Sequence, residues 1–376
     1  MTPKPDVLIV GCGVIGLSTA YLLAKRGLRV TMLDRGEPGR ESSWAGAGII
    51  PPGNWLTARE PMDRLRAVSS ALFPLWADEL ENETGLPVGY RVCGGLELFD
   101  AEPHDLVTLW HAEGIACERL SAEESSAVSP HLLPARVTYH FPWMAQVRNP
   151  WYLKALLAAV GRLGVEVVPN QEVTAFESAE SRVLAVWSQD GSRHEGGRIL
   201  LCPGAWGGRI LKWLKVTLPV TPVRGQIVLY RTPPNLLTKV VCVGKYYFVP
   251  RGDGRLLVGA TEDPDAGFDK SITVTDQEAL TRFAVAHVPA LANAPVEHTW
   301  AGLRPGSPGG VPFVGPVPGF TNAFFAGGHY RAGIQLSPGT ALAMSQLIVG
   351  ETPWLDLSPF RLDRPAAEPR LRPFQS

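Results

Sequence analysis

Apolar runs alternate with turn residues at the start of the chain. Residues 7–10 form a short apolar run, the pattern of a buried parallel strand. Residues 17–25 follow a helical pattern that ends at Gly27, and residues 29–33 form a second strand-like run that ends at Asp34. The pattern therefore predicts a strand, a turn, a helix and a second strand in that order.

Short strands are expected along most of the remaining chain. Leu96 and Leu98 alternate with Glu97 in the stretch 85–100, and Asp190-Gly191 is a strong hairpin signal. Further expected strands are residues 165–168, 181–187, 193–195, 198–201, 226–230, 240–243, 246–249 and 255–260, with another around Glu172 and Val173; helices are expected at 105–113, at 153–163 and from about Gly333.

Composition narrows the classes of function. The 376 residues carry 35 Lys and Arg against 36 Asp and Glu, a net charge of −1, without a basic block, so we expect no nucleic-acid partner. Five cysteines lie scattered with no C-x-x-C pair, which argues against a disulfide framework or a metal site and favours a cytoplasmic location. Residues 7–24 are uncharged, but glycines interrupt them, so we expect no signal peptide and no stable membrane association.

The turn after the first strand carries the most specific motif. Gly11, Gly13 and Gly16 form G-x-G-x-x-G between a strand and a helix. Gly11 would make the tight turn, Gly13 would let the backbone approach a pyrophosphate, and Gly16 would let the helix pack closely on the strand. Asp34 follows the second strand, where it would accept a hydrogen bond from a ribose hydroxyl. The full context predicts a dinucleotide site; a glycine-rich turn in an unrelated α/β domain would not explain Asp34.

Two further segments are suited to a close approach to a large ligand. Residues 41–50 are mostly small and include two hydroxyls, so they can lie flat against a planar ligand; an ordinary surface loop is the alternative. Residues 202–207, with Gly204, form a small-residue turn after a buried strand and predict a second approach to the cofactor.

These elements predict an α/β fold with two domains, close to the number expected from chain length. The nucleotide-binding domain is of Rossmann type and discontinuous, formed by residues 1–84, 147–218 and 297–362. A β-rich substrate domain, an antiparallel sheet with helices, is inserted as residues 85–146 and 219–296. The Pro- and Arg-rich tail 363–376 is expected to be loose.

Candidate functional residues are most concentrated near the C-terminus, in residues 300–306, 311–315 and 323–334. With the N-terminal motif, these segments resemble the FAD-dependent D-amino-acid oxidase family of amine oxidoreductases, over about residues 5–360, and most closely its glycine-oxidising members in the thiamine pathway. The resemblance implies that FAD contacts Val14, Ile15, Asp34, Arg35, Ser42, Ser43, Ala47, Gly48, Ile49 and the backbone of Val173, and that His329, Tyr330, Arg331, Ala332, Gly333, Ile334 and Gln335 pass beside the flavin.

The resemblance also implies a substrate site formed by Arg304, its tyrosine partner Tyr247 and a second arginine, Arg331. A planar guanidinium suits the carboxylate of an α-amino acid. Each residue also has a structural alternative. Arg304 could form a structural ion pair, Tyr247 could pack in the core, and Arg331 could contact a phosphate or a carbonyl group. A neutral amine that delivers hydride from Cα to flavin N5 needs no general base, so we predict none; His329 is expected to pack against the flavin edge. The products would be an imine, which would supply thiazole synthesis, and, with molecular oxygen, hydrogen peroxide.

Some features leave the exact reaction open. No cysteine follows Cys242, so we predict noncovalent FAD, unlike sarcosine-oxidase relatives. Glu262 is an acid where the family has an apolar residue, so it either narrows the pocket, meets the amine or is a solvated loop residue. Glycine is the leading substrate, with sarcosine and D-alanine as further candidates. The alternatives are a dehydrogenase of D-amino acids that reduces a quinone, a sarcosine-oxidase-like enzyme, a tRNA-modifying flavin domain and a non-catalytic scaffold. The resemblance implies a homo-oligomer, a tetramer.

Overall fold

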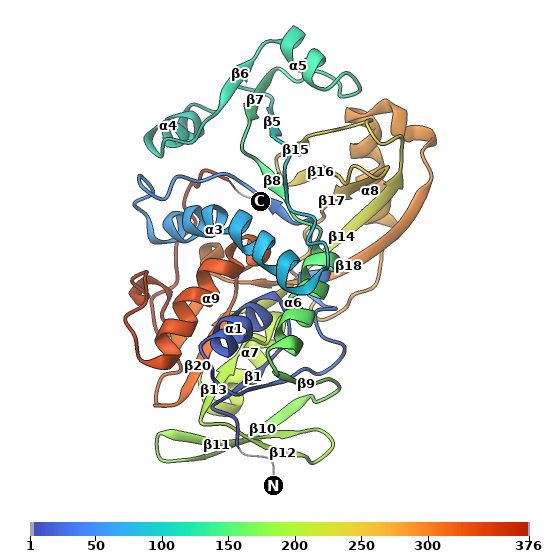
Figure 1. Ribbon diagram of the computed structural model, residues 1–376. Helices are drawn as coiled ribbons and strands as arrows, with labels where there is room; N and C mark the ends of the chain where they lie inside the picture. The colour runs from blue at the N-terminus through green and yellow to red at the C-terminus, as the bar shows by residue number, and fades with distance from the viewer. Residues whose placement is uncertain (1–3, 375–376) are drawn as a thin grey trace.

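A six-stranded sheet forms the lower half of the molecule (Figure 1). The computed structural model describes residues 4–374. The strand order is β19-β20-β13-β1-β2-β9, with all neighbours parallel except β19 and β20. The strands are β1 (Val7–Val10), β2 (Val30–Leu33), β9 (Glu166–Val168), β13 (Arg198–Leu201), β19 (Phe313–Pro316) and β20 (Ala323–Gly327).

Both faces of this sheet are covered, which explains the uninterrupted apolar run in β1. Val7 and Ile9 pack into a core with the helices, whereas Leu8 and Val10 pack into a second core that includes Val183. The helices on the first face are α1 (Val14–Lys25), α3 (Pro61–Thr84), α6 (Asn149–Arg162) and α9 (Gly333–Val349). The second face carries a three-stranded sheet, β10 (Val173–Ala179), β11 (Arg182–Ser188) and β12 (Arg193–Glu195), and α7 (Gly207–Ile210).

An eight-stranded sheet forms the other half, in the order β18-β14-β17-β16-β15-β5-β7-β6. All its pairs are antiparallel except β15 with β5. Its strands are β5 (Gly95–Phe99), β6 (Glu118–Leu120), β7 (Val137–Phe141), β14 (Thr221–Arg231), β15 (Val240–Val243), β16 (Tyr246–Pro250), β17 (Arg255–Gly259) and β18 (Val296–Gly306); its helices are α4 (His104–Ala112), α5 (Ala122–Val128) and α8 (Val274–His287).

A small sheet lies at the junction of the two halves, where β8 (Ala145–Gln146) pairs with β3 (Ile49–Ile50) and β4 (Arg91–Val92). The short helix α2 (Ser42–Ala45) precedes β3 and contacts β18. The segment 41–50 is therefore anchored to the sheet that carries Arg304 and forms a helix and a strand in place of a flat loop.

The fold class is confirmed, and most expected strands lie within one or two residues of the predicted positions. The hairpin at Asp190-Gly191 is also confirmed, since β11 and β12 pair across it. Sequence reasoning missed α3 and α8, although Pro61 at the start of α3, Gly85 at its end with φ 71° and the Thr273 N-cap of α8 are start and stop signals.

One predicted domain boundary differs from the structure. We assigned residues 297–306 to the nucleotide-binding domain, but β18 pairs with β14 along almost its whole length. Cross-strand pairing over this distance cannot be read from local pattern, because β14 lies far away in sequence.

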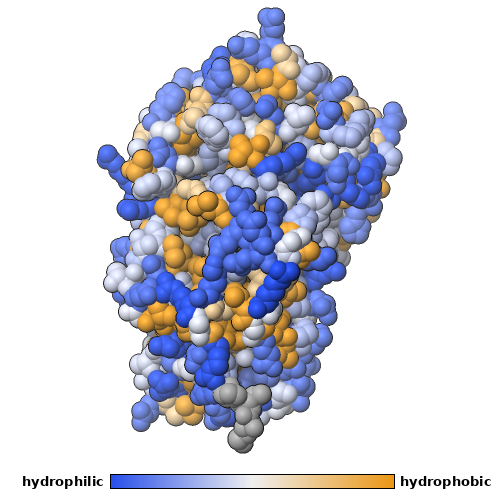
Figure 2. Space-filling view, viewed as in Figure 1, coloured by the Kyte–Doolittle hydropathy of each residue, from blue (hydrophilic) through white to orange (hydrophobic). Residues whose placement is uncertain are grey.

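No helix in the described part of the chain is long and apolar enough to cross a membrane. The uncharged segment 7–24 instead divides into β1, the glycine turn and α1. Figure 2 shows hydrophobic residues in separate groups among hydrophilic ones on the face in view.

The described part of the C-terminal tail, residues 363–374, is held by packing near its end, contrary to the expectation of a loose segment; residues 375–376 lie outside the described residues. The Phe374 ring is buried between Trp110 and Phe141, with ring centroids 6.4 and 5.1 Å away. Trp110 Nε1 donates to the carbonyl of Pro373 at 2.6 Å, and Arg66 donates to the carbonyl of Phe374 at 2.7 Å. Because Arg66 belongs to α3, Phe374 lies against this helix. Composition suggested disorder, but a single aromatic anchor and two hydrogen bonds from buried groups order the segment.

Phe374→Ala is expected to lower the free energy of unfolding by about 3 kcal/mol, because it removes a buried ring and leaves a cavity beside Trp110. Chemical denaturation would measure the change. Leu371→Ala is the control, since that side chain is exposed and its removal should cost almost nothing. Equal stabilities for the Phe374 variant and the wild type would show that the tail does not pack in solution.

Glu97 faces apolar neighbours in the eight-stranded sheet, opposite Cys242 on one side and Tyr139 on the other. Burial raises the pKa of Glu97 to about 8. Because this folded-state pKa lies above the unfolded value, the protein should lose stability as the pH rises from about 4.5 through 8.

Glu97→Gln should remove that loss, so the variant should gain about 4 kcal/mol over the wild type at pH 8.5 and about 1 kcal/mol at pH 5. Thermal melts of both proteins at the two pH values would test this. A difference between variant and wild type that is the same at both pH values would contradict the assigned titration.

Candidate active site

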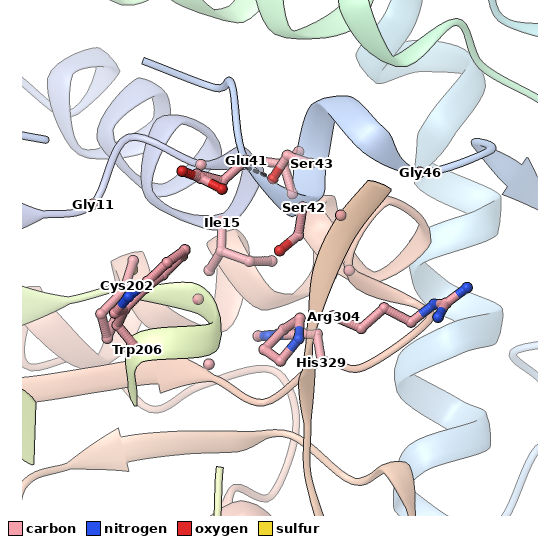
Figure 3. A pocket seen from close by; sticks show the side chains of 18 of the residues that line it. Gly11, Ile15, Glu41, Ser42, Ser43, Gly46, Cys202, Trp206, Arg304 and His329 are labelled. Carbon is pink, nitrogen blue, oxygen red and sulfur yellow. Dashed lines mark hydrogen bonds between the residues drawn. The ribbon is translucent and has the colours of Figure 1, made fainter. Parts of the chain in front are cut away.

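One elongated cavity runs along the carboxyl ends of β1, β2 and β13 and continues under the eight-stranded sheet. Figure 3 shows Trp206 and Cys202 at one end, Arg304 extending towards the other, and Ile15, Ser42 and His329 between them. Of the residues that the sequence assigned to cofactor or substrate, those that line it are Gly11, Gly13, Val14, Ile15, Asp34, Arg35, Ser42, Ser43, Ala47, Gly48, Ile49, Val173, Gly204, Tyr247, Arg304, His329, Tyr330, Arg331, Gly333, Ile334 and Gln335.

Two assigned residues, Gly16 and Ala332, do not line the cavity. A Cβ on Gly16 would lie 2.0 Å from the carbonyl oxygen of Gly11, so this glycine lets α1 approach the turn from behind. Ala332 is 5% exposed and packs into the core as the N-cap of α9. Both positions shape the cavity without reaching it.

Gly11 shows why the turn needs a glycine. Its φ is 106°, in the left-handed region, and a Cβ there would lie 2.2 Å from the carbonyl oxygen of Cys202. The Cys202 amide in turn donates to the carbonyl of Val10 at 2.7 Å. The two cofactor-facing turns, after β1 and after β13, are therefore in direct backbone contact.

Asp34 holds the glycine turn as well as facing the cavity. Its Oδ2 accepts from the amide of Cys12 at 2.7 Å, and its Oδ1 accepts from the amide of Gly36 at 3.0 Å. Burial raises the pKa of Asp34, and these two amide donors act in the opposite direction. Each carboxylate oxygen has a second lone pair, so the side chain can still accept from a ribose hydroxyl.

Ser43 joins the segment 41–50 to the start of α1. Its Oγ accepts from the amide of Val14 at 3.0 Å, and its carbonyl accepts from Asn149 Nδ2 at 2.9 Å. The Ala47 carbonyl accepts from Arg251 at 2.7 Å, which ties the same segment to the eight-stranded sheet. These contacts fix a small-residue wall along the cavity.

Charged and aromatic side chains from distant segments meet at the β1 end of the cavity. Arg35 stacks on Trp206, with its guanidinium carbon 3.5 Å from the ring centroid, and pairs with Glu41 at 2.6 Å. Lys270 pairs with Glu41 from the opposite side at 3.1 Å. The lining residues at this end that sequence reasoning missed include Gln171, Glu172, Arg209 and Trp213. No local motif marks them, because three distant segments meet at this end.

The opposite end brings together Arg304, Tyr247 and Arg331. The Arg304 guanidinium lies over Gly225 of the paired strand, where a Cβ would be 2.2 Å from it, and donates to the carbonyl of Thr261 at 3.1 Å. The Tyr247 ring similarly lies over Gly259 of its neighbouring strand, where a Cβ would be 2.7 Å away. Glycines in the sheet thus make room for both side chains.

The charges at this end affect each other. Burial raises the pKa of Tyr247, and nearby Arg304, Arg331 and Arg251 lower it in part, so the hydroxyl stays protonated at neutral pH. Arg331 donates to Glu262 at 2.5 Å. This arrangement offers guanidinium and hydroxyl donors to a small anion.

The sequence matches the family described as FAD dependent oxidoreductase over residues 6–347. The chain belongs to this family. A glycine oxidase of Pseudomonas aeruginosa is 38% identical over 361 residues, which cover 94% of this chain and 97% of that protein. A bifunctional protein ThiO/ThiG of Trichormus variabilis is 32% identical over 378 residues, 96% of this chain and 55% of that protein. The crystal structure of glycine oxidase from Geobacillus kaustophilus has a TM-score of 0.91 at 32% identity and covers 97% of this chain and 100% of that chain.

The cavity fits FAD by its own geometry. The backbone at Gly11 and Gly13 and the start of α1 would hold the pyrophosphate, because amide groups and the positive end of the helix dipole meet there. Asp34 lies beside them for the ribose. The long cavity then leads past Ile15 and Ser42 to His329 and α9, where the isoalloxazine ring would lie.

His329 is suited to packing against the flavin and not to acid–base chemistry. It is 2% exposed, its Nε2 lies 3.2 Å from Thr340 Oγ1, and burial lowers its pKa to about 3. The imidazole is therefore neutral at physiological pH. Helix α9 begins four residues later, at Gly333, with its N-terminus at the cavity, and its positive end would stabilise negative charge on reduced flavin.

Proposed function

We propose that this protein is an FAD-dependent oxidase of glycine, with sarcosine and D-alanine as further small substrates. The observation that carries the proposal is the meeting of Arg304, Tyr247 and Arg331 at one end of an FAD cavity. A scaffold without catalysis would have no need for two arginines and a tyrosine hydroxyl beside a flavin. The similarity to glycine oxidases over nearly the whole chain supports the same assignment.

Arg304 would bind the substrate carboxylate. Its guanidinium is held by Thr261 and has further N–H groups for a bidentate contact, and the protonated Tyr247 hydroxyl can donate as a third contact. Together they would fix the carboxylate and so orient the amine and Cα of the substrate.

Bound FAD supplies the oxidising power by accepting a hydride from the substrate Cα. The chain itself then needs only to position the substrate with a neutral amine and to exclude water. His329 is buried and neutral, so we assign it no proton transfer in this reaction. The overall reaction converts the amino acid and molecular oxygen into an imine and hydrogen peroxide. We further propose that this imine is used in thiazole synthesis, which the similarity to the bifunctional protein ThiO/ThiG supports.

Anaerobic addition of glycine to the purified flavoprotein tests the proposal. Glycine, sarcosine and D-alanine are added separately while the flavin absorbance band is followed, and air is then admitted while peroxide is measured. We expect glycine to bleach the band and peroxide to appear. Acetate is the matched control, since it has the carboxylate without the amine and should leave the band unbleached. A band that none of the three amines bleaches would remove the substrate assignment, and bleaching without peroxide would indicate another electron acceptor.

We also propose that FAD is held noncovalently and that the protein is a tetramer. The sequence has no cysteine after Cys242, and the Cys242 and Cys202 thiols have pKa values raised by burial, which makes them poor nucleophiles. Flavin should therefore separate from the protein on denaturation and filtration. Flavin retained by the denatured chain would contradict this, and a monomeric mass by light scattering would contradict the tetramer.

A further inference from the structure

Glu262 neutralises one of the two arginines at the substrate end of the cavity. Its Oε2 lies 2.5 Å from Nη2 of Arg331, and the two side chains are 28% and 17% exposed. Arg331 lines the cavity and Glu262 does not, and the Glu262 charge also acts on Arg304. Arg251 is also near, but its donors are used by Ala47, Gln146 and Val147 and it does not line the cavity.

The backbone around Glu262 is held on both sides. The Thr261 hydroxyl accepts from the amide of Gln226 at 3.1 Å, and the Thr261 carbonyl accepts from Arg304. Asp263 exchanges two backbone hydrogen bonds with Arg224, each 2.9 Å, and pairs with its side chain at 2.8 Å. One segment therefore positions both substrate-side arginines, Arg304 through a carbonyl and Arg331 through a carboxylate.

We propose that Glu262 restricts this site to amines that carry a single carboxylate. Arg304, Arg331 and Glu262 together have a net charge of +1, which one carboxylate neutralises when the substrate amine is neutral. A second anionic group would have to bind Arg331, and it would then lie beside the Glu262 carboxylate and be repelled. Glu262 is thus a specificity-determining residue that acts through Arg331. This inference rests on the proposed function.

The kinetic test compares glycine with iminodiacetate, a secondary amine with two carboxylates. Glu262→Gln should raise the ratio of kcat/KM for iminodiacetate to that for glycine by about tenfold to a hundredfold, because it removes a like charge from the second anion site. Adding Arg331→Gln in a double variant should abolish the gain, since the second carboxylate would lose its partner. Asp265→Asn is the matched control: it removes a nearby negative charge on an exposed side chain, and the ratio should stay at the wild-type value.

A binding measurement separates this inference from the proposed function. Glycolate and oxydiacetate, which have no amine to oxidise, are titrated into the holoenzyme while the flavin difference spectrum is recorded. Glu262→Gln should tighten oxydiacetate at least about tenfold more than glycolate. If the wild type oxidises none of the amines but this shift occurs, the proposed function fails and the role of Glu262 stands.

Unchanged selectivity in both measurements, with glycine oxidised normally, would overturn the role of Glu262 and leave the proposed function intact. Should the Gln variant fail to retain flavin, Glu262→Met provides an uncharged side chain of similar length for the same two measurements. Glu262→Asp, which keeps the charge, should keep the wild-type preference for the monocarboxylate in both. A merely structural role would instead lower turnover of the two amines together.

Discussion

Arg304→Ala is expected to lower kcat/KM for glycine by about a thousandfold. The guanidinium lies over Gly225 with one donor on Thr261, in a position that β18 and β14 fix by continuous pairing. Removing one partner of a buried, hydrogen-bonded charge pair costs about 2–5 kcal/mol, which corresponds to this range of rate loss. Steady-state kinetics with glycine would measure it.

The size of the loss depends on the shape of the guanidinium as well as on its charge. Arg304→Lys keeps the charge but loses the planar fork, so it should retain only part of the activity. Arg255→Ala is the control, because Arg255 lies in the same sheet but pairs with Asp253 and Glu297 at the surface. The flavin content of all three variants should match that of the wild type. A normal kcat/KM in Arg304→Ala would exclude this residue as the carboxylate ligand.

Gly11→Ala is expected to yield protein that lacks FAD and is destabilised by about 3 kcal/mol or more. The new Cβ would lie 2.2 Å from the Cys202 carbonyl oxygen, and a φ of 106° is unfavourable for alanine. Both are backbone constraints, so the turns after β1 and β13 would have to separate and the pyrophosphate site would be lost. The ratio of flavin to protein absorbance and a thermal melt would report the two effects.

Gly36→Ala is the matched control for that variant, because a Cβ at Gly36 meets no atom within 4 Å and its φ is not positive. It lies two residues after Asp34, in the same loop region, and should leave both flavin content and melting temperature unchanged. Wild-type flavin content in Gly11→Ala would mean that the two turns can move apart without loss of the site.

The N-terminal part of the site was readable from sequence because its signals are local. Gly11, Gly13 and Asp34 belong to one strand–turn–helix–strand unit, in which each residue type follows from a backbone requirement within a few residues. Five strands of the eight-stranded sheet, β5 and β14 to β17, were likewise expected from the sequence, whereas β6, β7 and β18 were missed. The long helix α3 was also missed, although its Pro61 start and Gly85 end lie in the sequence. Arg304 and Tyr247 were proposed through family resemblance, which local pattern alone would not supply.

The sequence by itself determined the fold class and the FAD-binding unit, and family resemblance added the proposal that Arg304 and Tyr247 bind a carboxylate. Tertiary structure decided which distant segments meet: β18 joins β14, Trp206 stacks on Arg35, Phe374 orders the tail, and Glu262 faces Arg331. The reason is physical. Turns and helix ends depend on backbone conformation over a few residues, but a charge pair between residues 262 and 331 exists only after two parts of the chain have packed together.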